Sequence, residues 1–255
     1  MTIDYNYNSI YEIITSSLKN NIPLSIIRYG DGEAMLLDKD RSSAAFKRFV
    51  FKRQLGLGVS DIGKNQITKN LIKAYEQADI IGIPTERHLK REDHWGKSAD
   101  ILKYNISNIS NKKFCSVDFH SEFLDNRMFD KLLINQEELI YISSNDLDKQ
   151  FKDKFNVKNT KSFIIAPEIH FQPDYIGASH YPDQFNEIKK WIKNIDCKNK
   201  LCLVGAGVVG KIYNIWFKKQ GGVSIDIGSV FDSWAGKKTR GVGRGAGVID
   251  EAYKL

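Results

Sequence analysis

The chain has 255 residues, of which 42% are hydrophobic and 27% are charged, as is typical of a globular protein that buries one large core. Its three cysteines form no C-x-x-C pair, which argues against a disulfide framework or a structural zinc site. No segment approaches the roughly 18 consecutive apolar residues of a membrane span, and the N-terminal residues do not resemble a signal peptide. We therefore expect a cytoplasmic protein with no transmembrane segment and at most a peripheral membrane contact.

The net charge of +7 favours anionic partners such as phosphates, nucleotides, nucleic acids or lipid headgroups. The lysines are scattered along the chain rather than gathered in blocks, so an ordinary solvated surface explains the charge equally well. No segment combines clustered Lys and Arg with interleaved aromatic residues, and a nucleic-acid partner is therefore not expected.

Short apolar runs alternate with helical patterns along most of the chain. A first amphipathic helix is predicted at 7–20, and strands follow at 24–28, 79–84, 138–143, 162–167, 200–205 and 223–228. Further helices are predicted at 61–77, 122–134, 145–154, 182–194 and 208–220, whereas 113–119 is ambiguous between a strand and the start of a helix. This alternation predicts an α/β fold in which helices cover both faces of a mostly parallel sheet.

The domain organisation is predicted from the lack of internal repeats and of Pro- or Ser-rich linkers. We expect a single domain over residues 1–235. The segment 236–255 is rich in glycine and basic residues, and it is predicted to be a tail. Its basic residues, beginning with Lys237, could close over a diphosphate or remain a solvated end.

Two carboxylates, Asp31 and Glu33, follow directly after the first predicted strand. Ligands of open α/β sheets bind outside the carboxyl ends of the strands. In an extended loop, side chains two residues apart point the same way, so both carboxylates could face one ion. Carboxylate oxygens suit Mn²⁺ or Mg²⁺, and such an ion would neutralise the charge that develops on a leaving nucleoside diphosphate.

The acid-x-acid spacing is not specific, because it recurs at 38–40 and at 146–148. Asp38 lies among charged residues, as in a solvated turn, and Asp146 lies near a predicted helix start, where acids have a structural explanation. Only Asp31 follows a buried type of strand and is flanked by glycines, Gly30 and Gly32, which permit a close approach of the backbone to a ligand.

A second candidate site is the string KLCLVGAGVVGKIY, which predicts a strand, a G-x-G-x-x-G turn and a helix. Gly205, Gly207 and Gly210 hold the glycine positions, and Asp226 follows at about the distance expected of a ribose-binding acid. An NAD(P)-dependent oxidoreductase is therefore one candidate. The short segment after Asp226 lacks a clear second βα unit, which favours a contact with a nucleotide or sugar phosphate instead.

The strings SIIRYGDGE, GAGVVGKIY and SIDIGSVFDSWAG together resemble the GT-D type glycosyltransferases of bacteria. The resemblance extends from about residue 22 to about residue 240 and is strongest at its two ends. It implies a Rossmann-like, three-layer domain and a hexosyltransferase-type enzyme that uses a nucleotide-sugar donor, usually UDP-linked. It also implies a Mn²⁺ or Mg²⁺ ion on Asp31 and Glu33, and a glycan acceptor on a glycoprotein or surface polysaccharide.

The same strings provide the expected donor-binding residues: Arg28, Tyr29, Gly30, Gly205, Gly207, Asp226 and Asp232. Arg28 could contact the diphosphate or brace its own loop. Trp234, close to Asp232, could stack on a base or a sugar.

An inverting transferase also needs a general base for the acceptor hydroxyl, usually a carboxylate or a histidine. Asp118 lies near the end of the ambiguous segment at 113–119 and His120 comes directly after it, and Glu168 and His170 follow a predicted strand. Ordinary local pairing is the simpler explanation for all four side chains. Glu168 is the favoured base because it follows the strand directly and starts a long loop.

Overall fold

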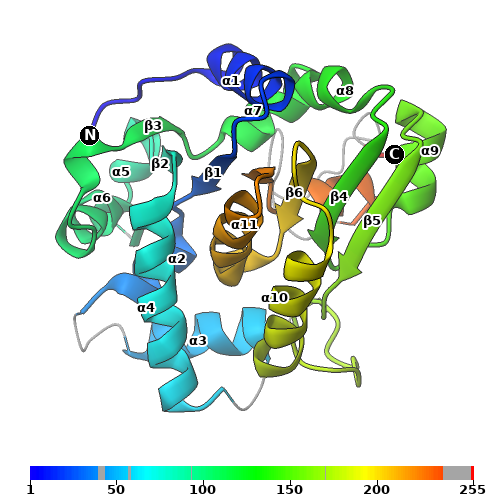
Figure 1. The fold of residues 1–255 in the computed structure, drawn as a ribbon. Coiled ribbons are helices and arrows are strands. Elements are labelled where there is room, and N and C mark those ends of the chain that lie inside the picture. Colours follow the sequence, from blue (N-terminus) through cyan, green and yellow to red (C-terminus); the bar gives the residue numbers. More distant parts are fainter. Residues whose placement is uncertain (40–43, 57–58, 93, 170, 238–253) are drawn as a thin grey trace.

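The computed structural model describes residues 1–39, 44–56, 59–92, 94–169, 171–237 and 254–255. These residues form a seven-stranded sheet in the order β3-β2-β1-β7-β6-β4-β5, and every pair of neighbouring strands is parallel (Figure 1). The strands are β1 (Leu24–Arg28), β2 (Ile80–Ile83), β3 (Lys113–Ser116), β4 (Glu138–Ser143), β5 (Asn159–Ile164), β6 (Leu201–Gly205) and β7 (Val223–Asp226).

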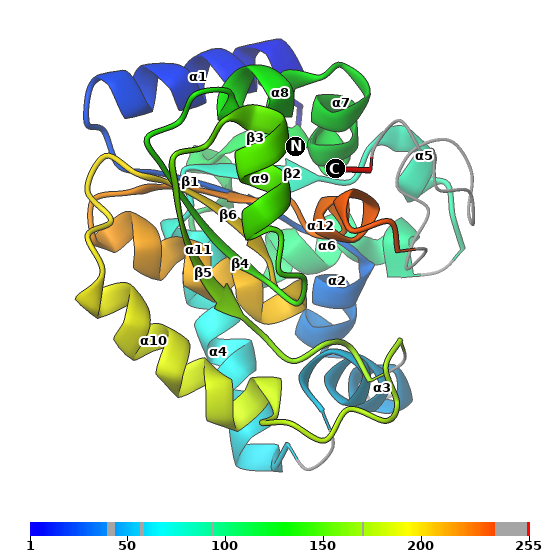
Figure 2. The same ribbon diagram turned by 90° about the vertical axis from the view of Figure 1, so that its right-hand side faces the viewer.

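Helices cover both faces of this sheet (Figures 1 and 2). One face is packed by α2 (Asp31–Leu37), α3 (Ala44–Leu55), α4 (Asp61–Gln77), α6 (His94–Asn105), α10 (Phe185–Asn194) and α11 (Gly210–Lys219). The other is packed by α1 (Tyr7–Lys19), α7 (Phe119–Asp125), α8 (Met128–Leu133), α9 (Asp148–Phe155) and α12 (Val230–Trp234). The short helix α5 (Glu86–Leu89) follows β2.

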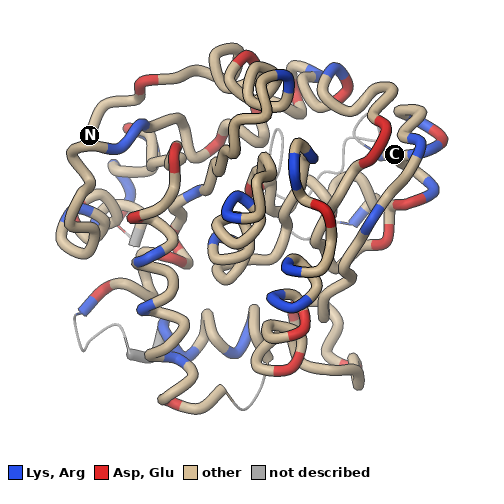
Figure 3. The backbone as a smooth tube through the Cα atoms, in the orientation of Figure 1, with Lys and Arg blue, Asp and Glu red and all other residues tan. Residues whose placement is uncertain are grey.

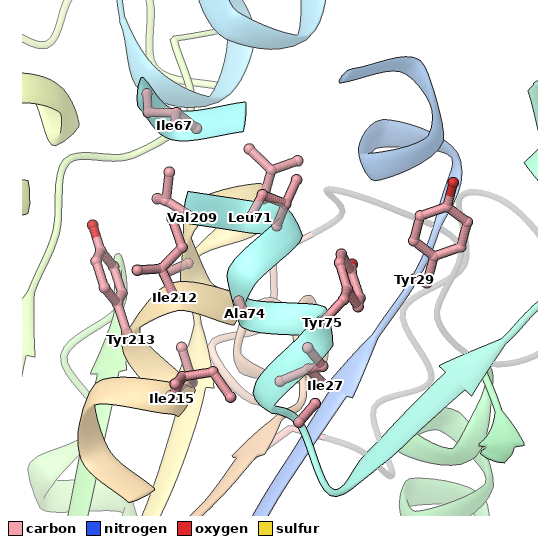
Figure 4. Close-up of a cluster of buried hydrophobic side chains, with 14 of the residues drawn as sticks. Ile27, Tyr29, Ile67, Leu71, Ala74, Tyr75, Val209, Ile212, Tyr213 and Ile215 are labelled. Carbon is pink, nitrogen blue, oxygen red and sulfur yellow. The ribbon is translucent and has the colours of Figure 1, made fainter. Parts of the chain in front are cut away.

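The central strands are buried along most of their length because both of their faces are covered. Successive side chains point to opposite faces. Ile27 therefore joins α4 and α11 in one hydrophobic cluster, and its neighbour Ile26 joins α1 and α7 in the other. Figure 4 shows the first cluster, with Leu71 and Tyr75 of α4 on one side and Ile212 of α11 on the other.

The α/β, Rossmann-like class with helices on both faces of the sheet is confirmed. Each of the six predicted strands corresponds to an observed one, and the ambiguous segment contains β3. Two local predictions are wrong. The segment after the first strand is not an extended loop, because α2 begins at Asp31. The single helix expected at 122–134 is two helices, α7 and α8, separated at Arg127, whose φ of 55° is left-handed.

The predicted tail falls largely outside the described residues, since 238–253 are not among them. Of its described part, the Leu255 N–H donates to the Trp234 carbonyl at 3.1 Å. The division into a domain and a tail stays a prediction. None of the helices within the described ranges is long and apolar enough to cross a bilayer.

The distribution of charges and the state of the cysteines can be read from the structure. Lys and Arg are spread over the helices and mixed with Asp and Glu in the view of Figure 3. Cys115, Cys197 and Cys202 are free thiols and all are buried. Burial raises the pKa of the Cys197 thiol to about 12, so this group stays protonated at neutral pH.

Candidate active site

A pocket of about 780 Å³ opens at the carboxyl edge of the sheet, where ligands of open α/β folds bind. Its volume lies within the range of small-molecule sites. Residues that follow every strand of the sheet contribute to its wall, among them Gly30, His88, Asp118, Ser144, Glu168, Gly207 and Gly228. Segments distant in sequence therefore meet at one site.

Most of the predicted site residues line this pocket: Arg28, Gly30, Asp31, Glu33, Asp118, His120, Glu168, Gly205, Gly207, Asp226 and Asp232. The two exceptions are Tyr29, which is buried elsewhere, and His170, which lies outside the described residues. The structure thus brings together the strings at both ends of the domain.

Tyr29 belongs to the hydrophobic core, and the prediction that it contacts the donor is corrected. Its ring is fully buried and packs edge to face against the ring of Tyr75, with 5.3 Å between the ring centroids (Figure 4). Burial, followed by the charge of Glu33, raises the pKa of Tyr29 well above its usual value. Trp234 is also core, 2% exposed, with Phe129 and Phe151 against its ring, so it does not stack on a ligand.

A chain of four charged side chains, which we call the floor network, forms the floor of the pocket: the partly exposed Arg28 and the buried Asp226, Lys211 and Glu33. Arg28 Nη2 lies 3.4 Å from Asp226 Oδ1. Lys211 Nζ lies 2.9 Å from Asp226 Oδ2 and 2.8 Å from Glu33 Oε1. The network joins β1, β7, α11 and α2, and its two positive charges balance its two negative charges.

The charge of Asp226 is maintained by its neighbours in the floor network. Burial acts to raise the pKa of this carboxyl, but the positive charges of Arg28 and Lys211 outweigh burial and lower the pKa to about 2. Asp226 Oδ2 also lies 3.3 Å from the backbone N–H of Arg28. The acid that the sequence suggested for a ribose is therefore bound to protein cations instead.

His120 lies beneath Arg28, whose Nη1 is 2.8 Å from His120 Nε2. Burial and then the charge of Arg28 lower the pKa of His120 well below its usual value, so the imidazole is neutral at pH 7. A neutral imidazole can accept a hydrogen bond from the guanidinium. His120 thus orients Arg28, and this contact together with the lowered pKa favours a positioning role for His120 over that of a general base.

The two carboxylates of the D-x-E string point in different directions. Because α2 begins at Asp31, residues two apart are separated by about 200° around the helix. Asp31 is exposed, whereas Glu33 is 6% exposed and accepts the Gly30 N–H at 2.9 Å, as the acid of a capping box does. The geometric premise of a shared ion is therefore wrong, and the metal role itself stays a prediction.

The glycine-rich turn is closed by a side chain from α3. Gln54 Oε1 accepts the Val208 N–H at 2.8 Å. Gly207 has φ +57°, and a Cβ there would overlap Gln54 Oε1, so this position favours glycine on two grounds. Gly32 lies beside Val208, because a Cβ added to Gly32 would stand 3.4 Å from Val208 Cγ1. The two glycine-containing strings therefore pack against each other.

The rim of the pocket has two half-exposed ion pairs. Arg53 Nε lies 2.8 Å from Glu168 Oε2, and its guanidinium lies over the Phe171 ring at 5.3 Å. At the other edge of the sheet, Arg87 Nη2 lies 3.0 Å from Asp118 Oδ2. Both carboxylates predicted as bases are therefore paired with arginine.

Among the pocket residues that the sequence analysis did not assign to the site are Gln54, Arg87, His88, Trp95 and Lys211. The His88 and Trp95 rings lie against each other, 4.3 Å between centroids. Burial lowers the pKa of His88, although the charge of Asp118 partly opposes this effect. A usable signal did exist, because Arg87 and His88 follow a predicted strand and Lys211 directly follows the glycine-rich turn.

The fit of a divalent ion depends on which oxygens are open. No group of three or more His, Cys, Asp or Glu side chains suited to a metal occurs within the described part of the chain. Glu33 uses one oxygen for Lys211 and the other for the Gly30 N–H. Asp31 is exposed and lines the pocket, and its Oδ1 accepts the Gly32 N–H at 2.9 Å. Its Oδ2 therefore fits a metal that takes its remaining ligands from a bound substrate and water.

The model of the GT-D fold-like domain family matches residues 5–234. This chain belongs to the GT-D-like family. The resemblance seen in the three strings is thereby confirmed, and the GT-D-like match also spans the middle of the chain, where no string had aligned.

Solved structures agree with this assignment. One is the structure of the highly conserved domain of unknown function 1792, which has a distinct glycosyltransferase fold. Its TM-score is 0.53 and its sequence identity is 16%, and the alignment covers 96% of this chain and 89% of that chain. Another is a glycosyltransferase from Streptococcus sanguinis with the same domain. Its TM-score is 0.55 and its sequence identity is 15%, and the alignment covers 100% of this chain and 94% of that chain. The GT-D-like chain thus has a glycosyltransferase fold. None of the curated proteins matches it, and the oxidoreductase alternative finds no support in these comparisons.

Proposed function

We propose that this GT-D-like chain is a metal-dependent glycosyltransferase that moves a hexose from a nucleotide-sugar donor, UDP-linked, to a glycan acceptor. The observation that carries the proposal is the convergence of Asp31, the glycine-rich turn and Asp232 on one pocket in a glycosyltransferase fold. A cytoplasmic enzyme of this kind would act on a glycoprotein or a surface polysaccharide before export.

The charge of the pocket supports a metal requirement. Its described lining contains five Lys and Arg and six Asp and Glu. The protein therefore offers no net positive charge to a nucleoside diphosphate, and an added cation would offset the negative charge that a leaving diphosphate develops. Mn²⁺ or Mg²⁺ held by Asp31 and the donor would supply that charge.

The chain's own cations would orient the donor around that ion. Arg28 lies at the floor, and Arg87, Arg91 and Lys237 also line the pocket. Arginine binds phosphate oxygens in a two-pronged geometry. Because His120 and Asp226 fix the Arg28 guanidinium, this side chain can meet a phosphate without first losing much conformational freedom.

Asp118 is the better of the two carboxylates for the general base. It follows β3, which is two strands from β1 and Asp31, whereas Glu168 follows β5, four strands from β1 on the other side. His88 Nε2 lies 3.7 Å from Asp118 Oδ1, and the charge of Asp31 also acts on His88. Asp118 is thus on the Asp31 side of the pocket, where it could take the acceptor proton.

Calorimetric titration of UDP and a panel of UDP-sugars, with and without Mn²⁺, tests the proposal. We expect binding that depends on Mn²⁺. Asp31→Asn should lower sugar transfer or donor hydrolysis by about 100-fold or more and leave the melting temperature nearly unchanged, because an exposed side chain contributes little to stability. Asp38→Asn is the matched control. Binding of NADH without any effect of UDP would refute the proposal.

A further inference from the structure

Lys211 lies in an unfavourable place for a lysine. It is in the first turn of α11, where the helix dipole disfavours a cation, and it is only 4% exposed. Its ammonium has three donors, and three acceptors meet it: Glu33 Oε1 at 2.8 Å, Asp226 Oδ2 at 2.9 Å and the Gly207 carbonyl at 3.0 Å. The ammonium is therefore held as a fixed internal cation.

Glu33 is matched to that cation rather than to the open pocket. Its side chain is 7% exposed, and its other oxygen accepts the Gly30 N–H at 2.9 Å. A divalent ion bound to Glu33 Oε1 would stand next to the Lys211 ammonium, and like charges at such short range repel strongly in a buried site. Asp31 has no such conflict, because it is exposed on the other side of α2.

We propose that the cation bound to Glu33 is Lys211 and not a metal ion, so that the two acids of the D-x-E string have different roles. Asp31 is the acid that binds a metal together with the donor. Glu33 is a positioning residue: it holds Lys211, and Lys211 holds Asp226 beneath the glycine-rich turn. The role of Asp31 rests on the proposed function, whereas the pairing of Glu33 with Lys211 does not.

The pairing of Glu33 with Lys211 predicts what should happen when the Lys211 ammonium is removed. Glu33 Oε1 and Asp226 Oδ2 both lie within 3 Å of Lys211 Nζ. Lys211→Met keeps an apolar stem and vacates the position of Nζ between two buried carboxylates. A pair of carboxylate oxygens around such a gap is suited to a hard divalent ion. The substitution should therefore create a metal site that the wild type lacks.

The first experiment measures Mn²⁺ binding in the absence of nucleotide, from the electron paramagnetic resonance signal of free Mn²⁺. We expect K211M to bind one Mn²⁺ more than the wild type, and K211M/E33Q to lose that additional site. A K211M protein that is folded by circular dichroism and gains no Mn²⁺ would overturn the proposal. This measurement needs neither donor nor turnover.

The second experiment measures Mn²⁺ affinity with UDP bound, and it decides the matter even if K211M does not fold. D31N should weaken Mn²⁺ binding by about tenfold or more, whereas folded E33Q should weaken it by clearly less than D31N does, because Glu33 acts on the bound ion only through the floor network. E33Q, but not D31N, should shift the ¹⁵N resonance of the Lys211 ammonium.

Each outcome of the second experiment has a distinct meaning. Equal losses of Mn²⁺ affinity in folded D31N and E33Q would show that Glu33 is a metal ligand and would overturn the proposal. A wild type that binds no Mn²⁺ with UDP would count against the metal-dependent function instead. In that case the Lys211 resonance in E33Q still decides the pairing: a shift supports it, and an unchanged resonance overturns it.

Discussion

The floor and the rim of the pocket use the same chemical groups in different surroundings. In the floor network the side chains of Lys211, Glu33 and Asp226 are 2–7% exposed, and that of Arg28 is 16% exposed. In the rim pairs the exposed fractions are 25% for Arg53 and 19% for Glu168, and 75% for Arg87 and 23% for Asp118. Ions taken out of water depend on their partners, whereas exposed ions are also stabilised by solvent. The floor should therefore be a fixed arrangement and the rim an adaptable one.

The largest expected effect is the removal of one charge from the floor network. Asp226→Asn leaves Lys211 and Arg28 with one buried counter-charge fewer, and breaking a buried pair in this way costs about 3–5 kcal/mol. The free energy of unfolding from urea titration should fall by that amount. A loss below about 1 kcal/mol, as for an exposed pair, would erase the distinction between floor and rim.

A smaller loss of stability is expected from a substitution in the glycine-rich turn, which lies beside the floor network. Gly207→Ala forces a Cβ onto a left-handed residue and into Gln54, which should cost about 1–3 kcal/mol. Gln54→Ala is the matched background, because it removes the atom that the new Cβ would meet and leaves the φ of residue 207 at +57°. A smaller loss of thermal stability from G207A in the Q54A background than in the wild type would show that Gln54 packs on the turn; equal losses would contradict this contact.

The stability of the protein should depend on pH through His120, which contacts Arg28 of the floor network. The pKa of His120 is lower in the folded protein than in the unfolded protein, mainly because the imidazole is buried. At mildly acidic pH this imidazole is therefore protonated in the unfolded protein and neutral in the folded one. Stability should therefore fall below pH 6.5 by up to about 1.4 kcal/mol per pH unit for this group. His120→Gln should flatten part of the slope. His180, whose pKa burial lowers to about 4, should account for another part in both proteins.

The smallest effect is expected at the rim. Glu168→Gln removes the charge partner of Arg53, and half-exposed pairs of this kind contribute about 0–1 kcal/mol. Donor-dependent turnover should also change little if Asp118 is the base. Asp118→Asn is the matched variant, and we expect it to reduce turnover without reducing donor affinity. The reverse result, with Glu168 essential and Asp118 dispensable, would move the base to the other edge of the sheet.

The architecture could be predicted from the sequence because most strands are apolar runs between helical patterns; β3 was ambiguous, and β5 begins three residues before the predicted run because its first half, 159–161, is polar. The pocket could be located for the same reason, since the ends of parallel strands share one edge. The direction of the Glu33 side chain could not be predicted, because it depends on whether the chain after Arg28 is extended or helical. Its partner, Lys211, is distant in sequence and reaches it only through the order of the strands.

The corrections at Tyr29 and Trp234 have a common cause. Both residues stand next to pocket residues in the sequence, yet neighbouring side chains point in different directions on a strand end or a short helix. Large rings are strongly favoured in the core, and both rings are buried there. A position within a recognisable string therefore does not by itself make a side chain a ligand contact.

The position of β1 has a consequence for how the protein is made. β1 pairs with β2 on one side and with β7 on the other, and Arg28 and Asp226 are 198 residues apart. During synthesis, β1 keeps an open edge until almost the whole domain has left the ribosome, and contacts so distant in sequence form slowly. Nascent chains that end before residue 223 should therefore be sensitive to proteases and unable to bind the donor, whatever their helix content.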